Sequence, residues 1–252
     1  MAVFKNAVFY PETANFIQSA GITDETQMKA IGRLVGDLKF FNIWDKMKAV
    51  YPFVGQAGVS GSFQFNLKDP GTFKGTFSGG WTFSSTGATP DGSTGFMNTN
   101  LNPRTSLNQN STHLSIYQNT NITGSVLMGV IISTSALELA PIVGGFDYNN
   151  INNSETGRTS GYTRYDSFIL ANRANPSEFQ SWYKDTKLYT TSATSTLPEN
   201  ANIYISGRNA SLPQRDTNTK CFASIGDGLT DTEAANLYTA VQRFQTTLGR
   251  QV

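Results

Sequence analysis

The sequence predicts a mainly β protein: one large sandwich or barrel with short helices at both ends. Its composition is rich in Thr, Ser and Asn and includes 23 glycines, residues that suit solvent-facing strand positions and turns. Between Gly55 and Gly226 apolar residues recur with a period close to two, in short runs bounded by turn residues. Outside that region the apolar spacing is helical.

The N-terminal segment is expected to be helical. A first short helix is predicted over 11–21, opened by a proline and ended near a glycine. Thr23 is expected to cap a second helix, whose apolar residues within 28–38 share one face. A third helix is predicted over 42–51, because its apolar residues again fall on one side and a proline follows it.

The central region is expected to contain many short strands joined by turns, which favours a sandwich or barrel over alternating strand and helix units. The segment 125–132 is continuously apolar, as a strand buried on both faces would be. The expected strands are 62–67, 72–77, 112–119, 125–132, 165–172, a hairpin within 179–190, 201–209 and 221–226.

The C-terminal segment predicts an amphipathic helix. Thr230 and Glu233 have the spacing of a capping box, and Gly249 is placed to end the helix. The apolar stripe of this helix needs a partner, as do the N-terminal helices, so we expect both ends of the chain to pack together against one side of the sandwich. The predicted division is a helical region at 1–58, a β-sandwich at 59–226 and the terminal helix at 227–252.

Charge and cysteine content exclude several classes of function. Charged residues are 15% of the chain and the formal net charge is +1, which gives no electrostatic basis for a nucleic-acid partner. The longest apolar run, 126–132, is too short to span a bilayer, and 1–10 lacks the pattern of a secretory signal peptide. We therefore expect a soluble protein without membrane insertion. Cys221 is alone and is expected to be buried at the start of a strand.

No residue pattern indicates catalysis, so a non-enzymatic protein is predicted. His113 is the only histidine, and its strand context favours a structural role. No strand carries the alternating acidic residues that sandwich glycosidases use. No metal or other cofactor is expected. A calcium site through Asp147, Asp166 or Asp227 stays open, since loop carboxylates suffice for one and no spacing singles one out.

The long segment 146–168 is the predicted binding surface. Its tyrosines lie among amides and hydroxyls, a combination that suits a sugar or a protein partner. An ordinary solvated loop, with tyrosines packed on the rim of the sheet, is the other interpretation. The candidate residues are Tyr148, Asn150, Asn152, Tyr162, Arg164 and Tyr165.

Three stretches, 41–55, 77–103 and 222–252, resemble a group of bacteriophage virion proteins. In that group a short helical region precedes a concanavalin A-like, or laminin G-like, jelly-roll sandwich, and a helix follows it. The segment THLSIYQNT resembles the central strand of that fold, and SWYKDTKLYT followed by NIYISGRN resembles a later pair of its strands. The motifs are structural and carry no active site or ligand set.

The resemblance implies a structural component of a virion, as a fibre, tail or capsid-surface protein. Such a protein would form a homo-oligomer, contact other virion proteins and meet a host-surface glycan or protein. Its location would be the virion, with the host cytoplasm during assembly. The alternative is a carbohydrate-binding or carbohydrate-cleaving lectin-like domain.

Overall fold

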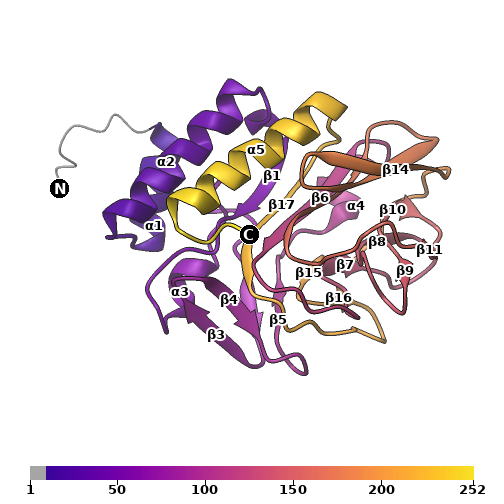
Figure 1. The fold of residues 1–252 in the computed structure, drawn as a ribbon, viewed down its shortest axis with the longest axis horizontal. Coiled ribbons are helices and arrows are strands. Elements are labelled where there is room, and N and C mark those ends of the chain that lie inside the picture. Colours follow the sequence, from indigo (N-terminus) through magenta and orange to yellow (C-terminus); the bar gives the residue numbers. More distant parts are fainter. Residues whose placement is uncertain (1–9) are drawn as a thin grey trace.

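The computed structural model describes residues 10–252, so the expectation about a signal peptide at 1–10 falls almost wholly outside it. These residues form three layers (Figure 1): helices, a large antiparallel sheet, and a smaller sheet on the opposite side. The helices are α1 (Pro11–Ala20), α2 (Glu25–Phe40), α3 (Ser60–Phe63), α4 (Pro103–Ser106) and α5 (Asp231–Thr247), with a 3-10 turn η1 (Trp44–Lys46).

The large sheet has the strand order β14-β13-β12-β6-β17-β4-β3, with β1 also paired to β17. All of these pairings are antiparallel. The strands are β1 (Met47–Tyr51), β3 (Trp81–Ser84), β4 (Gly87–Pro90), β6 (Thr112–Gln118), β12 (Ser167–Arg173), β13 (Glu178–Tyr183), β14 (Thr186–Ser192) and β17 (Lys220–Gly226).

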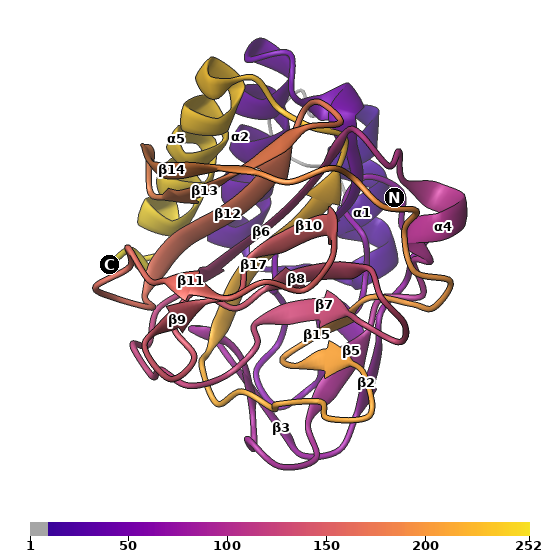
Figure 2. The same cartoon turned by 90° about the vertical axis from the view of Figure 1, so that its right-hand side faces the viewer.

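The small sheet has the order β10-β8-β7-β15-β5-β2, and β16 pairs in parallel with β7. Its strands are β2 (Thr76–Ser78), β5 (Phe96–Asn98), β7 (Met128–Val130), β8 (Ala136–Leu139), β10 (Asn150–Asn153), β15 (Tyr204–Ile205) and β16 (Arg208–Asn209). A separate ribbon joins β9 (Phe146–Asp147) to β11 (Arg158–Thr159). Figure 2 shows β7, β8 and β15 from the side of the small sheet.

Two apolar cores lie on opposite faces of the large sheet. Along β12, Ile169 packs in the core between the two sheets, whereas Phe168 and Leu170 pack in the core beneath the helices. Every residue of β6, β12 and β17 is buried as a result. A layer on each side explains why these strands carry apolar or hydrogen-bonded residues at consecutive positions.

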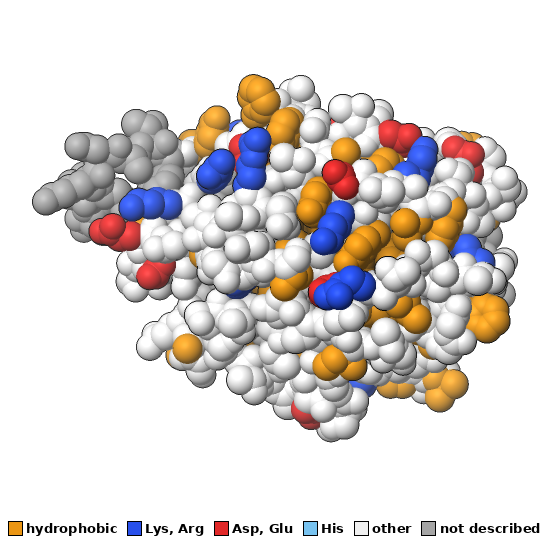
Figure 3. Space-filling model, viewed as in Figure 1, with side chains coloured by type: hydrophobic (Ala, Val, Ile, Leu, Met, Phe, Trp, Pro, Cys, Tyr) orange, Lys and Arg blue, Asp and Glu red, His pale blue; other side chains and the backbone are white. Residues whose placement is uncertain are grey.

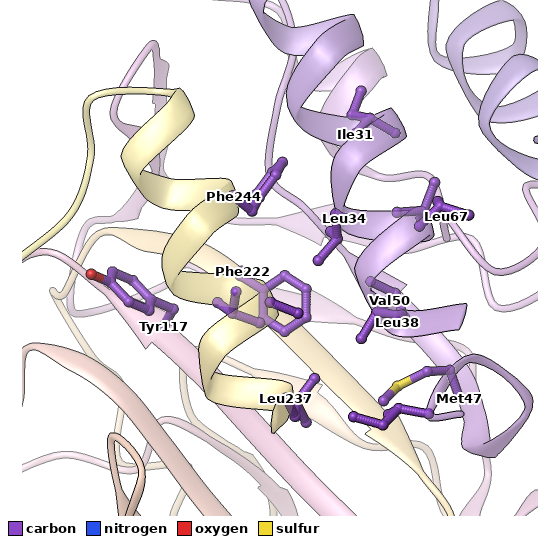
Figure 4. Close-up of a cluster of buried hydrophobic side chains, with 14 of the residues drawn as sticks. Ile31, Leu34, Leu38, Met47, Val50, Leu67, Tyr117, Phe222, Leu237 and Phe244 are labelled. Carbon is purple, nitrogen blue, oxygen red and sulfur yellow. The ribbon is translucent and has the colours of Figure 1, made fainter. Parts of the chain in front are cut away.

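The helical layer joins the two ends of the described chain. Leu34 of α2 and Leu237 and Phe244 of α5 meet over Phe222 of the large sheet, and all four are fully buried (Figure 4). The helix α5 begins at the predicted capping box, with Thr230 and Glu233 bonded reciprocally. The predicted docking of both ends against one side of the sandwich is therefore present in the structure.

The predicted third helix at 42–51 is wrong. Asn42 has a positive φ of 58°, and residues 47–51 form β1 against β17. Apolar spacing alone cannot separate a short helix from an irregular entry into a buried strand. At α2 the cap is Asp24 and not Thr23, because the Asp24 carboxylate accepts from the Gln27 N–H at 2.7 Å.

The predicted strand at 62–67 is also absent, and that at 72–77 shrinks to the short strand β2. Residues 60–63 form α3 instead. The side chain of Asn66 accepts from the Val50 N–H at 2.8 Å and donates to the Lys48 carbonyl at 3.1 Å. A side-chain amide thus takes the place of a neighbouring strand along β1. The predicted strands at 112–119, 165–172 and 221–226 and the 179–190 hairpin are confirmed.

Candidate functional site

Helices cover the outer face of the large sheet, whereas the outer face of the small sheet is partly accessible, at Tyr204, Asn98 and Thr76. Residues directly opposite one another in antiparallel pairing share a face. Leu137, Met97 and Ile205 point into the core between the sheets, so their strand neighbours point outward. One row of paired residues crosses this outer face: Asn150, Glu138, Gly129, Tyr204, Asn98 and Thr76.

At one end of the row lies a cavity of about 160 Å³, which we call the acidic pocket. Glu138 and Glu155 both accept from the same nitrogen, Arg208 Nη1, at 3.0 and 2.8 Å. The side chains of Tyr148 and Gln214 also line the cavity. The pocket therefore places one exposed carboxylate, that of Glu155, beside a guanidinium, an amide and a phenol that can form hydrogen bonds with hydroxyl groups, whereas Glu138 is fully buried.

Glu138 is fully buried, and burial raises its pKa to about 7 although Arg208 opposes that shift. Its second oxygen lies 3.4 Å from the side-chain amide of Asn150. Glycine at position 129 leaves room for the side chain of Glu138, since an added Cβ at residue 129 would lie 2.6 Å from the Glu138 Cβ. Glu155, in contrast, has a side chain that is 40% exposed.

Further along the row is a second feature, which we call the aromatic stack. The rings of Phe96 and Tyr204 are stacked with centroids 4.6 Å apart and an interplanar angle of 24°. The Arg215 guanidinium lies 4.3 Å from the centroid of the Phe96 ring. Aromatic rings that stay half exposed offer an apolar plate on which a sugar ring can rest.

The structure separates the six predicted loop residues. Tyr148 is half-buried and lines the acidic pocket. Arg164 is exposed, and its Nε donates to Asp166 at 2.7 Å. Arg164 is not among the residues that line the acidic pocket.

The other four predicted residues are buried and serve the fold. The Tyr162 hydroxyl donates to the Trp182 carbonyl at 3.0 Å, and that of Tyr165 donates to the Ser125 carbonyl at 2.8 Å. The amides of Asn150 and Asn152 donate to the backbone at 3.0 Å. The expectation of a binding loop built from these residues is therefore wrong for Asn150, Asn152 and Tyr165, which have no accessible surface, and for Tyr162, which is only 6% exposed.

His113 and the loop carboxylates are engaged with the protein itself. His113 is buried, with Nδ1 2.7 Å from the Asp227 carbonyl and Nε2 3.0 Å from Ser224 Oγ. Of the calcium candidates, Asp147 is buried with a pKa raised by burial to about 7, and Asp227 pairs with Lys48 at 3.2 Å. Within residues 10–252 no cluster of three His, Cys, Asp or Glu side chains is placed to hold a metal ion.

Charged side chains are sparse and mixed over the surface that Figure 3 draws, where Lys and Arg alternate with Asp and Glu among neutral groups. No helix within residues 10–252 combines the length and apolar character that crossing a membrane requires.

Comparison with known proteins identifies the fold. No family model and no curated protein matches the sequence. Among solved structures, domain 4 of the extracellular arabinanase AbnA from Geobacillus stearothermophilus, in complex with arabinotriose, is similar with a TM-score of 0.54 at 15% identity. The match covers 76% of this chain and 98% of that domain.

A sialidase variant from Trypanosoma rangeli that displays trans-sialidase activity is similar with a TM-score of 0.52 at 10% identity. That match covers 86% of this chain but only 39% of the sialidase. Identities this low show a shared fold alone. The predicted class, a mainly β, concanavalin A-like or laminin G-like sandwich with small terminal helices, is confirmed.

Proposed function

We propose that the protein is a non-enzymatic, carbohydrate-binding virion component, with its saccharide site on the outer face of the small sheet. The observation that carries this proposal is the row from the acidic pocket to the aromatic stack. Hydroxyl groups need paired donors and acceptors, which Glu155, Tyr148 and Gln214 supply. A sugar ring also needs an apolar plate, which Tyr204 supplies.

The fold of AbnA domain 4 supports the proposal, because that domain binds arabinotriose on a sandwich of similar architecture. The low charge of the chain fits a neutral or weakly charged ligand bound through individual contacts. The helical layer supports the choice of face, since it leaves the outer face of the large sheet without access.

The acidic pocket raises the alternative of glycoside cleavage, which needs two carboxyl groups that reach the glycosidic bond from opposite sides. Glu138 and Glu155 lie close to each other through Arg208. Glu138 has no exposed surface, however, and both of its oxygens have partners within the protein. A carboxyl group held in this way cannot protonate a leaving group, so we propose binding without turnover.

The virion assignment rests on the three resembling stretches of sequence. In this proposal the protein is a fibre, tail or capsid-surface component, forms a homo-oligomer with other virion proteins as neighbours, and presents the small sheet to host glycans. An antibody to this chain, imaged on intact phage particles, tests the location. Label on the capsid, tail or fibre supports it, and particles without label contradict it.

The binding claim is tested with the purified protein on a glycan array, followed by a reducing-sugar assay on each bound glycan. We expect binding without release of reducing ends. Tyr204→Ala should weaken binding about tenfold, equivalent to about 1.4 kcal/mol. The matched control is Phe40→Ala, which removes an aromatic ring that is 79% exposed on α2. Turnover of any glycan, or equal effects of the two variants, would contradict the proposal.

A further inference from the structure

Two arginines on the outer face of the small sheet differ sharply in their charge partners. Arg208 is held by two carboxylates, Glu138 and Glu155. Arg215 forms no ion pair with any carboxylate of residues 10–252. Asp91 is near enough to act electrostatically on Arg215, but it forms no ion pair with the guanidinium, and its Oδ1 accepts from the N–H groups of the three residues that follow Gly92.

The position of Arg215 is fixed by packing. Its guanidinium lies over the Phe96 ring, and an added Cβ at Gly207 would come within 2.9 Å of Arg215 Nη1 and 3.2 Å of its Cδ. The side chain therefore occupies the space that a side chain at residue 207 would need. Because this packing restricts the side chain of Arg215, less rotational freedom is lost when a ligand binds to it.

The charge of Arg215 is only partly compensated where it lies. Its Nη1 is buried and has no hydrogen-bond acceptor among the described residues. Burial lowers the pKa of the guanidinium, which records the cost of keeping this cation away from water. The residue stays half exposed, so its remaining edge is open to solvent. A desolvated cation gains more from an anion than a fully hydrated one does.

Tyr204 completes the arrangement. Its ring stacks on Phe96, so guanidinium, phenyl and phenol rings lie in sequence on one face. The Tyr204 hydroxyl forms no hydrogen bond with the described residues. In the acidic pocket Arg208 is already paired with Glu138 and Glu155, so it has no free charge to offer to an anionic ligand. An anionic ligand is thus directed to the aromatic stack and away from the pocket.

We propose that the ligand is a carboxylated sugar, whose carboxylate pairs with the exposed edge of Arg215 while its ring rests on Tyr204. A planar carboxylate matches the fork of a guanidinium, which a hydroxyl group cannot do. The remaining sugars of the chain extend along the row toward the acidic pocket and use their hydroxyls there. This inference rests on the proposed function and adds the charge class of its ligand.

The test uses charged saccharides with neutral counterparts of the same size. Trigalacturonic acid is compared with its methyl ester, and sialyllactose with lactose, by calorimetric titration of the full chain. The acidic member of at least one pair should bind about tenfold more tightly, as one charge-assisted contact gives. The pair that shows the preference tells whether the sugar is a uronic or a sialic acid. Added NaCl should reduce the preference.

The variant Arg215→Gln should abolish the preference for the acidic member and leave affinity for the neutral one within about threefold. The matched control is Arg33→Gln, which removes the same charge from the exposed side of α2. A retained preference in Arg215→Gln, or equal affinity for both members of each pair, overturns the inference and leaves the proposed function standing. Failure of every saccharide to bind overturns both. If Arg215→Gln does not fold, the comparison of acid and ester on the natural chain decides.

Discussion

Truncating Phe244 tests whether α5 seals the large sheet. Phe244 is fully buried, its ring lies 6.5 Å from that of Phe222, and the Arg250 guanidinium sits 5.5 Å from its centroid. Replacing a buried phenylalanine with alanine costs about 3–5 kcal/mol, through lost transfer free energy and the cavity that remains. Because Arg250 also loses the ring beneath it, we expect Phe244→Ala to fall in the upper half of that range.

The assay is urea unfolding followed by tryptophan fluorescence, since Trp44 and Trp182 are buried in the core beneath the helices. The matched control is Thr246→Ala on the same helix, where the side chain is exposed and the free energy of unfolding should change by less than about 0.5 kcal/mol. If the two variants unfold at the same urea concentration, α5 does not pack on the sheet. The outer face of the large sheet would then be accessible, and the choice of the small sheet as the binding face would have no support.

Three further predictions follow from buried groups and from the terminal helix. Burial lowers the pKa of His113 to about 4, below the value of about 6.5 expected in the unfolded chain. The free energy of unfolding should therefore fall by about 3 kcal/mol as the pH is lowered from about 6.5 to 4. NMR titration of this single imidazole measures the pKa, and a midpoint near 6.5 would contradict the prediction. Arg250→Met removes the buried donor to the carbonyls of Pro52 and Phe53 and one of the two side-chain donors to the Cys221 carbonyl. It should cost about 3 kcal/mol or more by urea unfolding, whereas a loss below about 1 kcal/mol would refute this role. Deleting 228–252 should give insoluble protein, and a truncated chain that stays folded and monomeric would assign α5 to an interface instead.

The elements that sequence predicts well carry their signals locally. The capping box of α5 needs only Thr230 and Glu233, three positions apart, and the β13–β14 hairpin needs only its own turn. The segment 42–51 shows the limit. Its conformation is decided by pairing with β17, about 175 positions later in the chain, and local periodicity carries no information about that partner.

The candidate site was beyond sequence reasoning for the same reason. Glu138 lies in an apolar run and bonds to Arg208, 70 positions away. Arg215 packs on the ring of Phe96, which lies on β5, far from Arg215 in the sequence. The composition of the loop at 146–168 predicts a recognition surface, yet Tyr162 and Tyr165 use their hydroxyls to satisfy buried carbonyls. Composition alone cannot distinguish a tyrosine or asparagine that binds a ligand from one that bonds to a buried group of the fold.

The most direct test of the central claim is to map which residues change when a saccharide selected by the glycan array binds. Backbone amide NMR shifts on titration would give this map. The account predicts that the largest shifts lie on β5, β7, β8 and β15, around Phe96, Tyr204 and Glu155, with α2 and α5 unchanged. Shifts centred on the helices, or on Arg164 and its neighbours without the small sheet, would contradict it.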